Sequence, residues 1–374
     1  MALLPENIFD AGKGVKTLEK KNASYKICHS KIKKMWYGKN ALLDLKKVLI
    51  EENPDILVVV WPYMLHLFFD RSIYRMMQEK NIRLMVREIP FQVPPFRKLS
   101  YFKTNPVYDE NLNLLSKGIG FRLRSLLTMY IRRFIYKRTN ASINYFSGAK
   151  DIVSSYGLNE KAFFYGNSTD TDSLLAVRDT VINSKRLMEE KPRILHIGRL
   201  VKWKKVDLLI DAFNLLSSKY PECELVIIGS GPEKESLEKQ VKNLELSDKV
   251  IFTGAIHDPL KLGQYMHESS VYVLAGMGGL SINDAMCFSL PVVCSVCDGT
   301  ETDLITDGVN GFFFNDSDIN SLTEKLDIIL SDTSTAKKMG EHSFAIIKEK
   351  VNMEKFSETY MDAFKFALNN KVTL

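Results

Sequence analysis

The chain has 374 residues, of which 45% are hydrophobic and 26% are charged. This length favours two domains, and this composition is that of a soluble globular protein. The formal charge of +6 is divided unevenly, because residues 1–180 hold 29 basic and 17 acidic side chains whereas the remainder holds 22 and 28. Different partners are therefore expected for the two halves. Nucleic acid is not expected, since no zinc-finger spacing, RNP-type aromatic motif or helix-turn-helix pattern occurs.

Cysteine content and hydropathy indicate the cellular compartment in which the protein is expected. Five cysteines suit a reducing environment. Cys294 and Cys297 form one C-x-x-C pair without a second, so free thiols are expected and no metal site is predicted. The sequence has no apolar run of about 18 residues, and Met1–Pro5 does not resemble a secretory signal. We expect a cytoplasmic protein, one that can lie peripherally on the inner face of the cell membrane.

Short apolar runs alternate with helical spacing throughout the chain. The strands expected in the first half are Tyr25–His29, Ile56–Trp61, Arg83–Val86, Ala141–Tyr145 and Ala162–Tyr165, and the helices are Ala41–Glu52, Tyr63–Lys80 and Leu112–Arg138. The strands expected in the second half are Arg193–Ile197, Glu224–Ile228, Val250–Thr253, Val271–Leu274 and Pro291–Cys294, and the helices are Val206–Lys219, Glu233–Leu244 and Ser281–Cys287. Such alternation predicts parallel sheets that are covered on both faces.

The fold class is therefore α/β, with two Rossmann-like domains. We expect a first domain over residues 1–172, a polar linker over 173–191, a second domain over 192–352 and a final helix over 353–374. Phe356, Tyr360, Phe364 and Leu368 recur at intervals of four and predict one apolar face on that helix. If the two domains face a cleft, this helix crosses back to pack on the first domain.

Glycine clusters follow three strands of the second half. Gly198-Arg199-Leu200 follows the first strand, Gly229-Ser230-Gly231-Pro232 follows the second, and Gly278-Gly279-Leu280-Ser281 follows Val271–Leu274 and precedes a helix. Ligands bind at the carboxyl ends of strands in open α/β sheets. Free N–H groups at a helix N-terminus, together with Arg and Lys, are suited to a diphosphate.

These motifs resemble those of the family-four retaining glycosyltransferases, also described as glycosyl transferases group 1, which have the GT-B fold. The similarity runs from about Asn167 to Phe314 and includes the pattern Gly198-Arg199-Leu200, Lys204 and Asp207. It implies that Arg199 and Lys204 are catalytic, because fixed cations stabilise the departing nucleoside diphosphate without a metal. The implied donor-binding residues are Gly198, Gly231, Gly279, Leu280, Ser281 and Asp284. No cofactor is implied apart from the nucleotide-sugar donor substrate.

The chain departs from the family pattern at Gly276. The family carries two acidic residues eight apart, of which the second holds the ribose and the first orients the donor sugar. Here Asp284 occupies the second position and Gly276 the first. The resemblance therefore implies ribose binding by Asp284 and the loss of one contact to the sugar.

The first half carries fewer functional signals. Met1–Lys21 shows no convincing version of the family's opening strand and Gly-rich loop, so that strand is absent or rebuilt. Where relatives place a histidine, this chain has Arg87 and Glu88; Glu88 and the interdomain Asn167 are our acceptor-side candidates. The Pro-rich stretch Phe91–Lys103 and the basic helix within Gly120–Arg138 combine aromatic and basic side chains. Such segments bind anionic membranes. The Pro-rich stretch is the better candidate, since the helix can equally bury its apolar face in the core.

Three functional hypotheses follow. The first is a glycosyltransferase that moves a sugar from a nucleotide-diphosphate sugar to a saccharide or lipid-linked acceptor, in cell-surface polysaccharide or glycolipid synthesis. The second is a GT-B-fold nucleotide-sugar epimerase, for which the first half offers no evident acid or base. The third is a non-catalytic nucleotide-binding partner of a glycosyltransferase.

Overall fold

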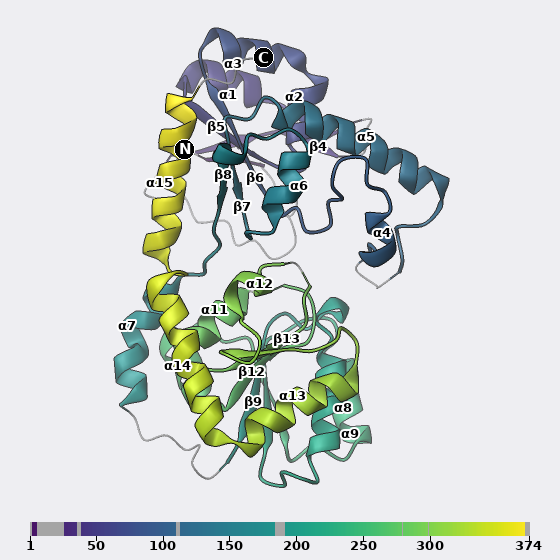
Figure 1. Ribbon diagram of the computed structural model, residues 1–374, viewed down its shortest axis with the longest axis vertical. Helices are drawn as coiled ribbons and strands as arrows, with labels where there is room; N and C mark the ends of the chain where they lie inside the picture. The colour runs from purple at the N-terminus through teal and green to yellow at the C-terminus, as the bar shows by residue number, and fades with distance from the viewer. Residues whose placement is uncertain are drawn as a thin grey trace.

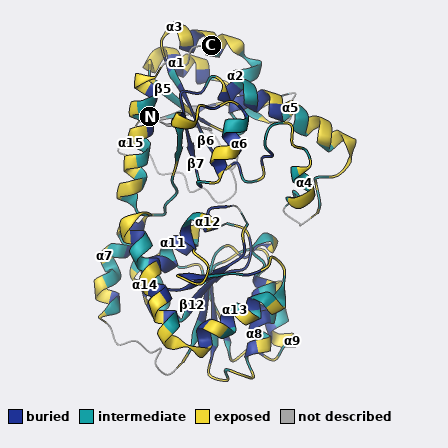
Figure 2. Cartoon of the chain, viewed as in Figure 1, coloured by how far each residue is buried: buried dark blue, intermediate teal, exposed yellow. Residues whose placement is uncertain are grey.

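The computed structural model describes residues 2–5, 26–35, 39–109, 113–183, 191–278, 280–297 and 299–370. Figure 1 shows two α/β domains stacked along the long axis of the molecule, each built around a parallel sheet. The central strands of both sheets are buried between helices, as their dark colour in Figure 2 shows. The predicted pair of Rossmann-like domains is confirmed.

The first domain is built on parallel strands in the order β5-β6-β7-β8 within its described part. The strands are β5 (Ile56–Val60), β6 (Arg83–Glu88), β7 (Ala141–Asn144) and β8 (Phe163–Tyr165). The helices are α1 (Leu45–Glu52), α2 (Met64–Phe69), α3 (Arg71–Glu79), α4 (Tyr101–Thr104), α5 (Gly118–Tyr136) and α6 (Ala149–Ser155). The single helix predicted over Tyr63–Lys80 is in fact two. Asp70 ends α2 and caps α3, because its carboxylate accepts a hydrogen bond from the Ser72 N–H at 3.0 Å.

Two short pairs of strands precede this sheet. β1 (Ala2–Pro5) pairs in parallel with β2 (Ile27–Ser30), and β3 (Ile32–Lys34) pairs antiparallel with β4 (Asn40–Leu42). The start of the chain therefore has a strand that the sequence pattern did not reveal. An apolar run this short is too weak a signal by itself.

The second domain contains parallel strands in the order β11-β10-β9-β12-β13-β14 within its described part. The strands are β9 (Arg193–Ile197), β10 (Glu224–Ile228), β11 (Val250–Gly254), β12 (Val271–Leu274), β13 (Val292–Cys294) and β14 (Gly311–Phe313). The helices are α8 (Val206–Leu216), α9 (Lys234–Asn243), α10 (Pro259–His267), α11 (Leu280–Cys287), α12 (Glu301–Leu304), α13 (Ile319–Ser331) and α14 (Thr333–Glu349). The strands β9, β10 and β12 have the bounds predicted from their apolar runs.

Part of the predicted linker is helical. Helix α7 (Thr171–Ile182) packs against α10 and α11, and it buries Leu174 and Val181 in the core of the second domain. Residues 184–190 of the predicted linker lie outside the described part of the chain. The domain boundaries drawn from the sequence thus remain predictions, while α7 associates with the second domain by its packing.

Helix α15 (Met353–Asn369) crosses back to the first domain, as predicted. It lies along the sheet of that domain in Figure 1, and its Ala363 and Ala367 are fully buried against Met85, Ala141 and Ile143. The predicted stripe of large residues is only partly correct, because Leu368 is exposed. Small alanine side chains form the centre of this contact and let the helix lie close to β6 and β7.

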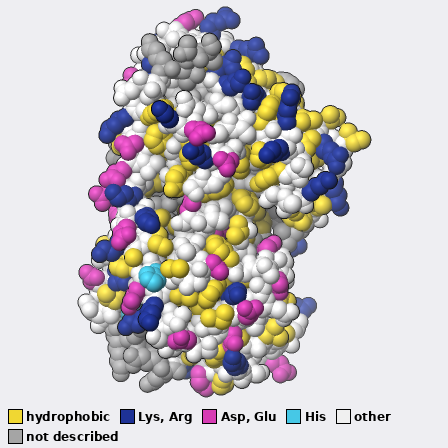
Figure 3. Space-filling view, in the orientation of Figure 1, with side chains coloured by type: hydrophobic (Ala, Val, Ile, Leu, Met, Phe, Trp, Pro, Cys, Tyr) yellow, Lys and Arg dark blue, Asp and Glu magenta, His cyan; other side chains and the backbone are white. Residues whose placement is uncertain are grey.

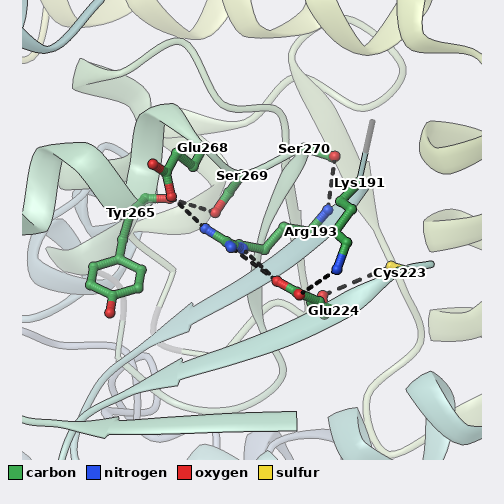
Figure 4. A network of polar contacts seen from close by, with 8 residues as sticks. All are labelled: Lys191, Arg193, Cys223, Glu224, Tyr265, Glu268, Ser269 and Ser270. Carbon is green, nitrogen blue, oxygen red and sulfur yellow. Dashed lines mark hydrogen bonds and ion pairs between the residues drawn. The ribbon is translucent and has the colours of Figure 1, made fainter. Parts of the chain in front are cut away.

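A charged network closes the amino ends of β9 and β10 (Figure 4). The Arg193 guanidinium donates to Glu268 at 2.7 Å and to Glu224 at 2.9 Å, and the Arg193 N–H donates to the Ser270 hydroxyl. Burial alone would raise the pKa of Glu224, but the Arg193 guanidinium outweighs it and lowers that pKa. This network holds the end of the sheet opposite the glycine clusters, so we regard it as structural.

At the carboxyl ends of the strands, backbone packs directly on backbone. A Cβ atom on Gly231 would lie 2.2 Å from the Leu200 carbonyl oxygen, and one on Gly276 would lie 2.2 Å from that of Trp203. Hydrogen bonds bind the same segments, since Leu200 N–H donates to Ser230 O at 3.0 Å and Met277 N–H donates to Trp203 O at 2.8 Å. Residues 198–204 are therefore held between two glycine turns that leave no room for a side chain.

This packing makes a stability prediction. Gly276→Ala should lower the free energy of unfolding by roughly 1–3 kcal/mol, because its methyl group overlaps the backbone of residues 203–204. Gly120→Ala is the control, since a Cβ there meets open space in helix α5, and it should stabilise the chain by up to about 1 kcal/mol. Urea unfolding measures both. Equal stability of Gly276→Ala and the wild type would contradict the contact.

Candidate functional site

The candidate site lies where β10, β9 and β12 end side by side. These strands are neighbours in the sheet, so the turns that begin at Gly198, Gly229 and Ala275 meet at one edge. This edge faces the first domain in Figure 1. The structure thus brings together the three motifs that the sequence singled out.

The two predicted catalytic cations lie on the loop between β9 and α8. Arg199 is exposed, and its side chain makes no hydrogen bond or ion pair with any described residue. Lys204 is half-buried, and its ammonium donates to the Gly278 carbonyl at 2.8 Å. The loop therefore presents one exposed guanidinium and one ammonium that is anchored over the turn leading into α11.

Helix α11 begins beside Lys204. Its first residues, Leu280 and Ser281, have backbone N–H groups at the open end of a helix, where an anion is favoured. The Ser281 hydroxyl is hydrogen-bonded to the Tyr272 hydroxyl at 2.6 Å, while the Ser281 backbone N–H lies at the open end of the helix. Gly279, the third predicted member of this turn, lies outside the described residues.

Asp284 lies in the second turn of α11. Its burial raises the pKa of the carboxyl group to about 6, and the negative charge of Asp170 adds to this effect. Asp284 is therefore only partly ionised near pH 6. The other predicted acid position, Gly276, is filled by the close approach of residues 203–204, so the contact itself excludes an acidic side chain there.

His196 is a residue at this site that the sequence reasoning missed. It is fully buried in β9, its Nδ1 contacts the Val273 carbonyl at 3.0 Å, and its Nε2 has no hydrogen-bond partner among the described residues. Burial lowers the pKa of His196 to about 4, and the charge of Lys204 adds to the shift. A neutral imidazole thus lies beneath the Gly198 turn. A polar residue within an otherwise apolar strand was the available signal.

The two acceptor-side candidates lie in different places. Glu88 ends β6 in a cavity of about 450 Å³, where its carboxylate is paired with Arg132 and accepts a hydrogen bond from Tyr136 at 2.7 Å. Asn167 lines a separate cavity of about 500 Å³ that is bordered by α12 and α15. Glu88 and Asn167 therefore line two neighbouring cavities, which share Tyr145 as a lining residue.

The two domains touch beside the cavity that Asn167 lines. The carboxylate of Asp303, in α12, accepts hydrogen bonds from the Ser147 N–H at 2.7 Å and from the Ser147 hydroxyl. Next to this pair, the ring of Phe146 packs on Gly299. A Cβ atom on Gly299 would lie 2.9 Å from that ring. Within the described residues no group of three or more His, Cys, Asp or Glu side chains could hold a metal ion.

A family model and several known proteins resemble part of this chain in sequence. Residues 177–345 match the family described as glycosyl transferases group 1. An uncharacterised glycosyltransferase of Haemophilus influenzae is 28% identical over 51% of this chain and 54% of its own length. The poly(glycerol-phosphate) alpha-glucosyltransferase of Bacillus subtilis is 29% identical over 49% of this chain and 26% of its own. The matches thus span about half of the first relative and about a quarter of the second.

Solved structures resemble the chain over both domains. The Anabaena protein HepE in complex with UDP has a TM-score of 0.61 at 16% identity, and it covers 86% of this chain and 81% of its own. TarM of S. aureus, in a complex that includes UDP, has a TM-score of 0.60 at 19% identity, over 87% of this chain and 60% of its own. The chain therefore has the GT-B fold, and residues 177–345 are similar to the glycosyl transferases group 1.

Proposed function

We propose that this chain is a glycosyltransferase that moves a sugar from a nucleotide-diphosphate sugar to a saccharide or lipid-linked saccharide acceptor. Its place would be in cell-surface polysaccharide or glycolipid synthesis. The observation that carries this proposal is the pairing of Arg199 and Lys204 with the start of α11 at one edge of the sheet. The UDP bound to HepE and the polymer named for the Bacillus relative support the donor and acceptor classes.

The proposed chemistry follows from the charges at this edge. As the bond to the anomeric carbon breaks, negative charge grows on the departing diphosphate. Arg199, Lys204 and the N–H groups of Leu280 and Ser281 stabilise that charge without a metal ion. The acceptor hydroxyl oxygen then bonds to the anomeric carbon on the face that the diphosphate leaves, through an oxocarbenium-like state, so that configuration is retained. Its proton passes to the departing diphosphate oxygen. Asp284 holds the ribose hydroxyls.

The two alternative functions have less support. A nucleotide-sugar epimerase needs an acid or base in the first domain, and Glu88 is already occupied by Arg132 and Tyr136. A non-catalytic nucleotide-binding partner would also use Arg199 and Lys204 to bind a diphosphate, so turnover of a nucleotide sugar is what separates it from an enzyme. The relatives reported above are described as glycosyltransferases.

Replacing either cation tests the proposal. Arg199→Ala and Lys204→Ala should each lower turnover of a nucleotide sugar by about 10²–10³-fold, as the loss of one preorganised donor does elsewhere. Lys202→Ala is the matched control, because Lys202 is an exposed cation on the same loop, and it should keep wild-type turnover. Release of the nucleoside diphosphate from a panel of nucleotide sugars measures this. Unchanged rates in both variants would refute the site.

Asp284 predicts a pH dependence of donor binding. A diphosphate diester such as UDP-glucose does not titrate between pH 5 and 8, so any change in its affinity there arises from the protein. If ionised Asp284 binds the ribose, affinity should fall about tenfold as pH drops from about 7 to 5, because the pKa of Asp284 is about 6. Asp284→Asn should bind more weakly at pH 7 and show a flat profile by calorimetry. The same slope in both proteins would exclude Asp284 from the ribose contact.

We also propose that an anionic membrane surface is a partner of the first domain. The first turns of α5 expose Ile119, Leu123 and Leu127 by 77%, 62% and 56%, and their spacing of four places them on one face. This segment projects at the right of Figure 3, where apolar and basic side chains gather. Arg122 and Arg124 lie on the same helix, Lys117 precedes it, and Arg97 donates a hydrogen bond to Tyr130 of α5. Among the described helices, none combines the length and hydropathy that a bilayer-spanning segment needs.

Helix α5 is thus the better candidate than the Pro-rich stretch, which the sequence favoured. The apolar side chains of that stretch turn inward, since Val93 is buried and Phe96 and Leu99 pack on the core of the first domain. Sequence alone could not decide this, because the partners of Phe96 and Leu99 are distant in the chain.

Vesicle sedimentation tests the membrane surface. The protein should bind vesicles that contain equal parts of phosphatidylcholine and phosphatidylglycerol, and bind phosphatidylcholine alone weakly. Leu123→Glu should reduce binding about tenfold, because it places an acid in the apolar face. Leu215→Glu is the control, since Leu215 is 54% exposed on α8 of the second domain. Equal binding by the two variants would contradict this role for α5.

A further inference from the structure

The cavity at the carboxyl ends of β5, β6 and β7 contains more than the predicted Glu88. Its volume of about 450 Å³ is within the range of small-ligand sites. The residues that give it chemical character are Trp61, Arg87, Glu88, Gln92, Arg132 and Tyr145. We call it the Arg87 cavity. Because it lies at the strand ends that point toward the second domain, it is on the side of the first domain where an acceptor must approach (Figure 1).

Glu88 and Arg132 neutralise one another within its wall. Their side chains are only 4% and 9% exposed, and they form a buried ion pair. The second carboxylate oxygen of Glu88 accepts from the Tyr136 hydroxyl, while the Arg132 guanidinium stacks on the Trp61 ring at 4.0 Å. Glu88 therefore has no remaining charge to offer a ligand. Arg132, however, keeps a buried Nε with no hydrogen-bond partner among the described residues.

Arg87 has no acidic partner among the described residues. It donates to the Tyr145 hydroxyl at 2.6 Å, and its guanidinium lies 4.8 Å from the centre of that ring. Tyr360 of α15 also lies near Arg87, and its hydroxyl is neutral at physiological pH because burial raises its pKa. A guanidinium has five N–H donors, so most of those on Arg87 are left for water or a ligand. Because the charges of Glu88 and Arg132 cancel, the cavity has a net positive charge that comes from Arg87.

A purely structural role accounts for Arg132 but not for Arg87. The Arg132 side chain is paired with Glu88 and stacked on Trp61. The Arg87 side chain is oriented by its hydrogen bond to Tyr145, and no described acidic side chain pairs with it. A guanidinium held in this way is suited to a planar or tetrahedral anion, which it binds through two parallel hydrogen bonds. The concave wall provides room for the sugar ring that carries the anion.

We infer that the Arg87 cavity binds an anionic group, a phosphate or a carboxylate, that is carried by the saccharide acceptor. This inference rests on the proposed glycosyltransferase function and assigns the acceptor class for it. Arg87 contacts the anion, and the acceptor hydroxyl that reacts points out of the cavity toward the second domain. Neutral saccharides lack this contact and bind less tightly.

Saturation-transfer NMR on the full chain, without donor, tests the inference. Glucose 6-phosphate, glucuronate and glucose are titrated in turn, so that the first two separate a phosphate from a carboxylate. At least one charged sugar should bind about tenfold more tightly than glucose, as expected for one added charge-assisted contact. Arg87→Gln should abolish this preference and Arg87→Lys should keep part of it. Arg83→Gln is the matched control, because Arg83 is a half-buried arginine at the opposite end of the same strand, and it should keep the full preference.

Three results would overturn the inference. The first is equal binding of charged and neutral sugars, and the second is equal loss in Arg83→Gln and Arg87→Gln. The third is loss of the preference in Arg199→Ala rather than in Arg87→Gln, which would place the anion in the donor site. Failure of the proposed function looks different, because nucleotide-sugar turnover would then be absent while charged sugars still require Arg87.

Discussion

The site depends on a backbone contact that only glycine permits. Residues 198–204 pass between the turn at Gly231 and the turn at Gly276, with carbonyl oxygens where Cβ atoms would otherwise lie. Backbone hydrogen bonds fix the loop to both turns, and Lys204 reaches Gly278 as a consequence. The positions of the two cations are therefore set by main-chain packing. A loop held in this way loses little entropy when it binds an anion.

The first domain contributes to the proposed site through packed side chains rather than through main-chain contacts. Its contribution is a cavity whose wall is a buried ion pair stacked on Trp61, with Arg87 as the excess charge. Such a pair is costly to bury, and removing one partner would destabilise the fold because the other charge would remain buried without a counterion. Glu88 and Arg132 thus shape the cavity, and Asp303 and Ser147 hold it against the second domain. In the proposed reaction, donor and acceptor chemistry are divided between the two domains.

Much of the second domain could be predicted from its sequence. The strands β9, β10 and β12 are mainly apolar runs, which is what burial on both faces of a parallel sheet requires. The order of motifs along the chain then predicted one functional edge. The need for a glycine at position 276 could not be predicted, because it arises from a contact with Trp203, which is distant in sequence. The same holds for Glu88, whose partner Arg132 is 44 residues away.

The last helix has a consequence for the order of folding. Ala363 and Ala367 cover one face of β6 and β7, and the Asn140 side chain donates to the Asn370 carbonyl at 2.9 Å. All of the second domain is synthesised between β7 and these residues. During translation the second domain can fold as soon as it emerges, whereas the first waits with part of its sheet open to water. The domain that begins the chain is therefore the one that is finished last.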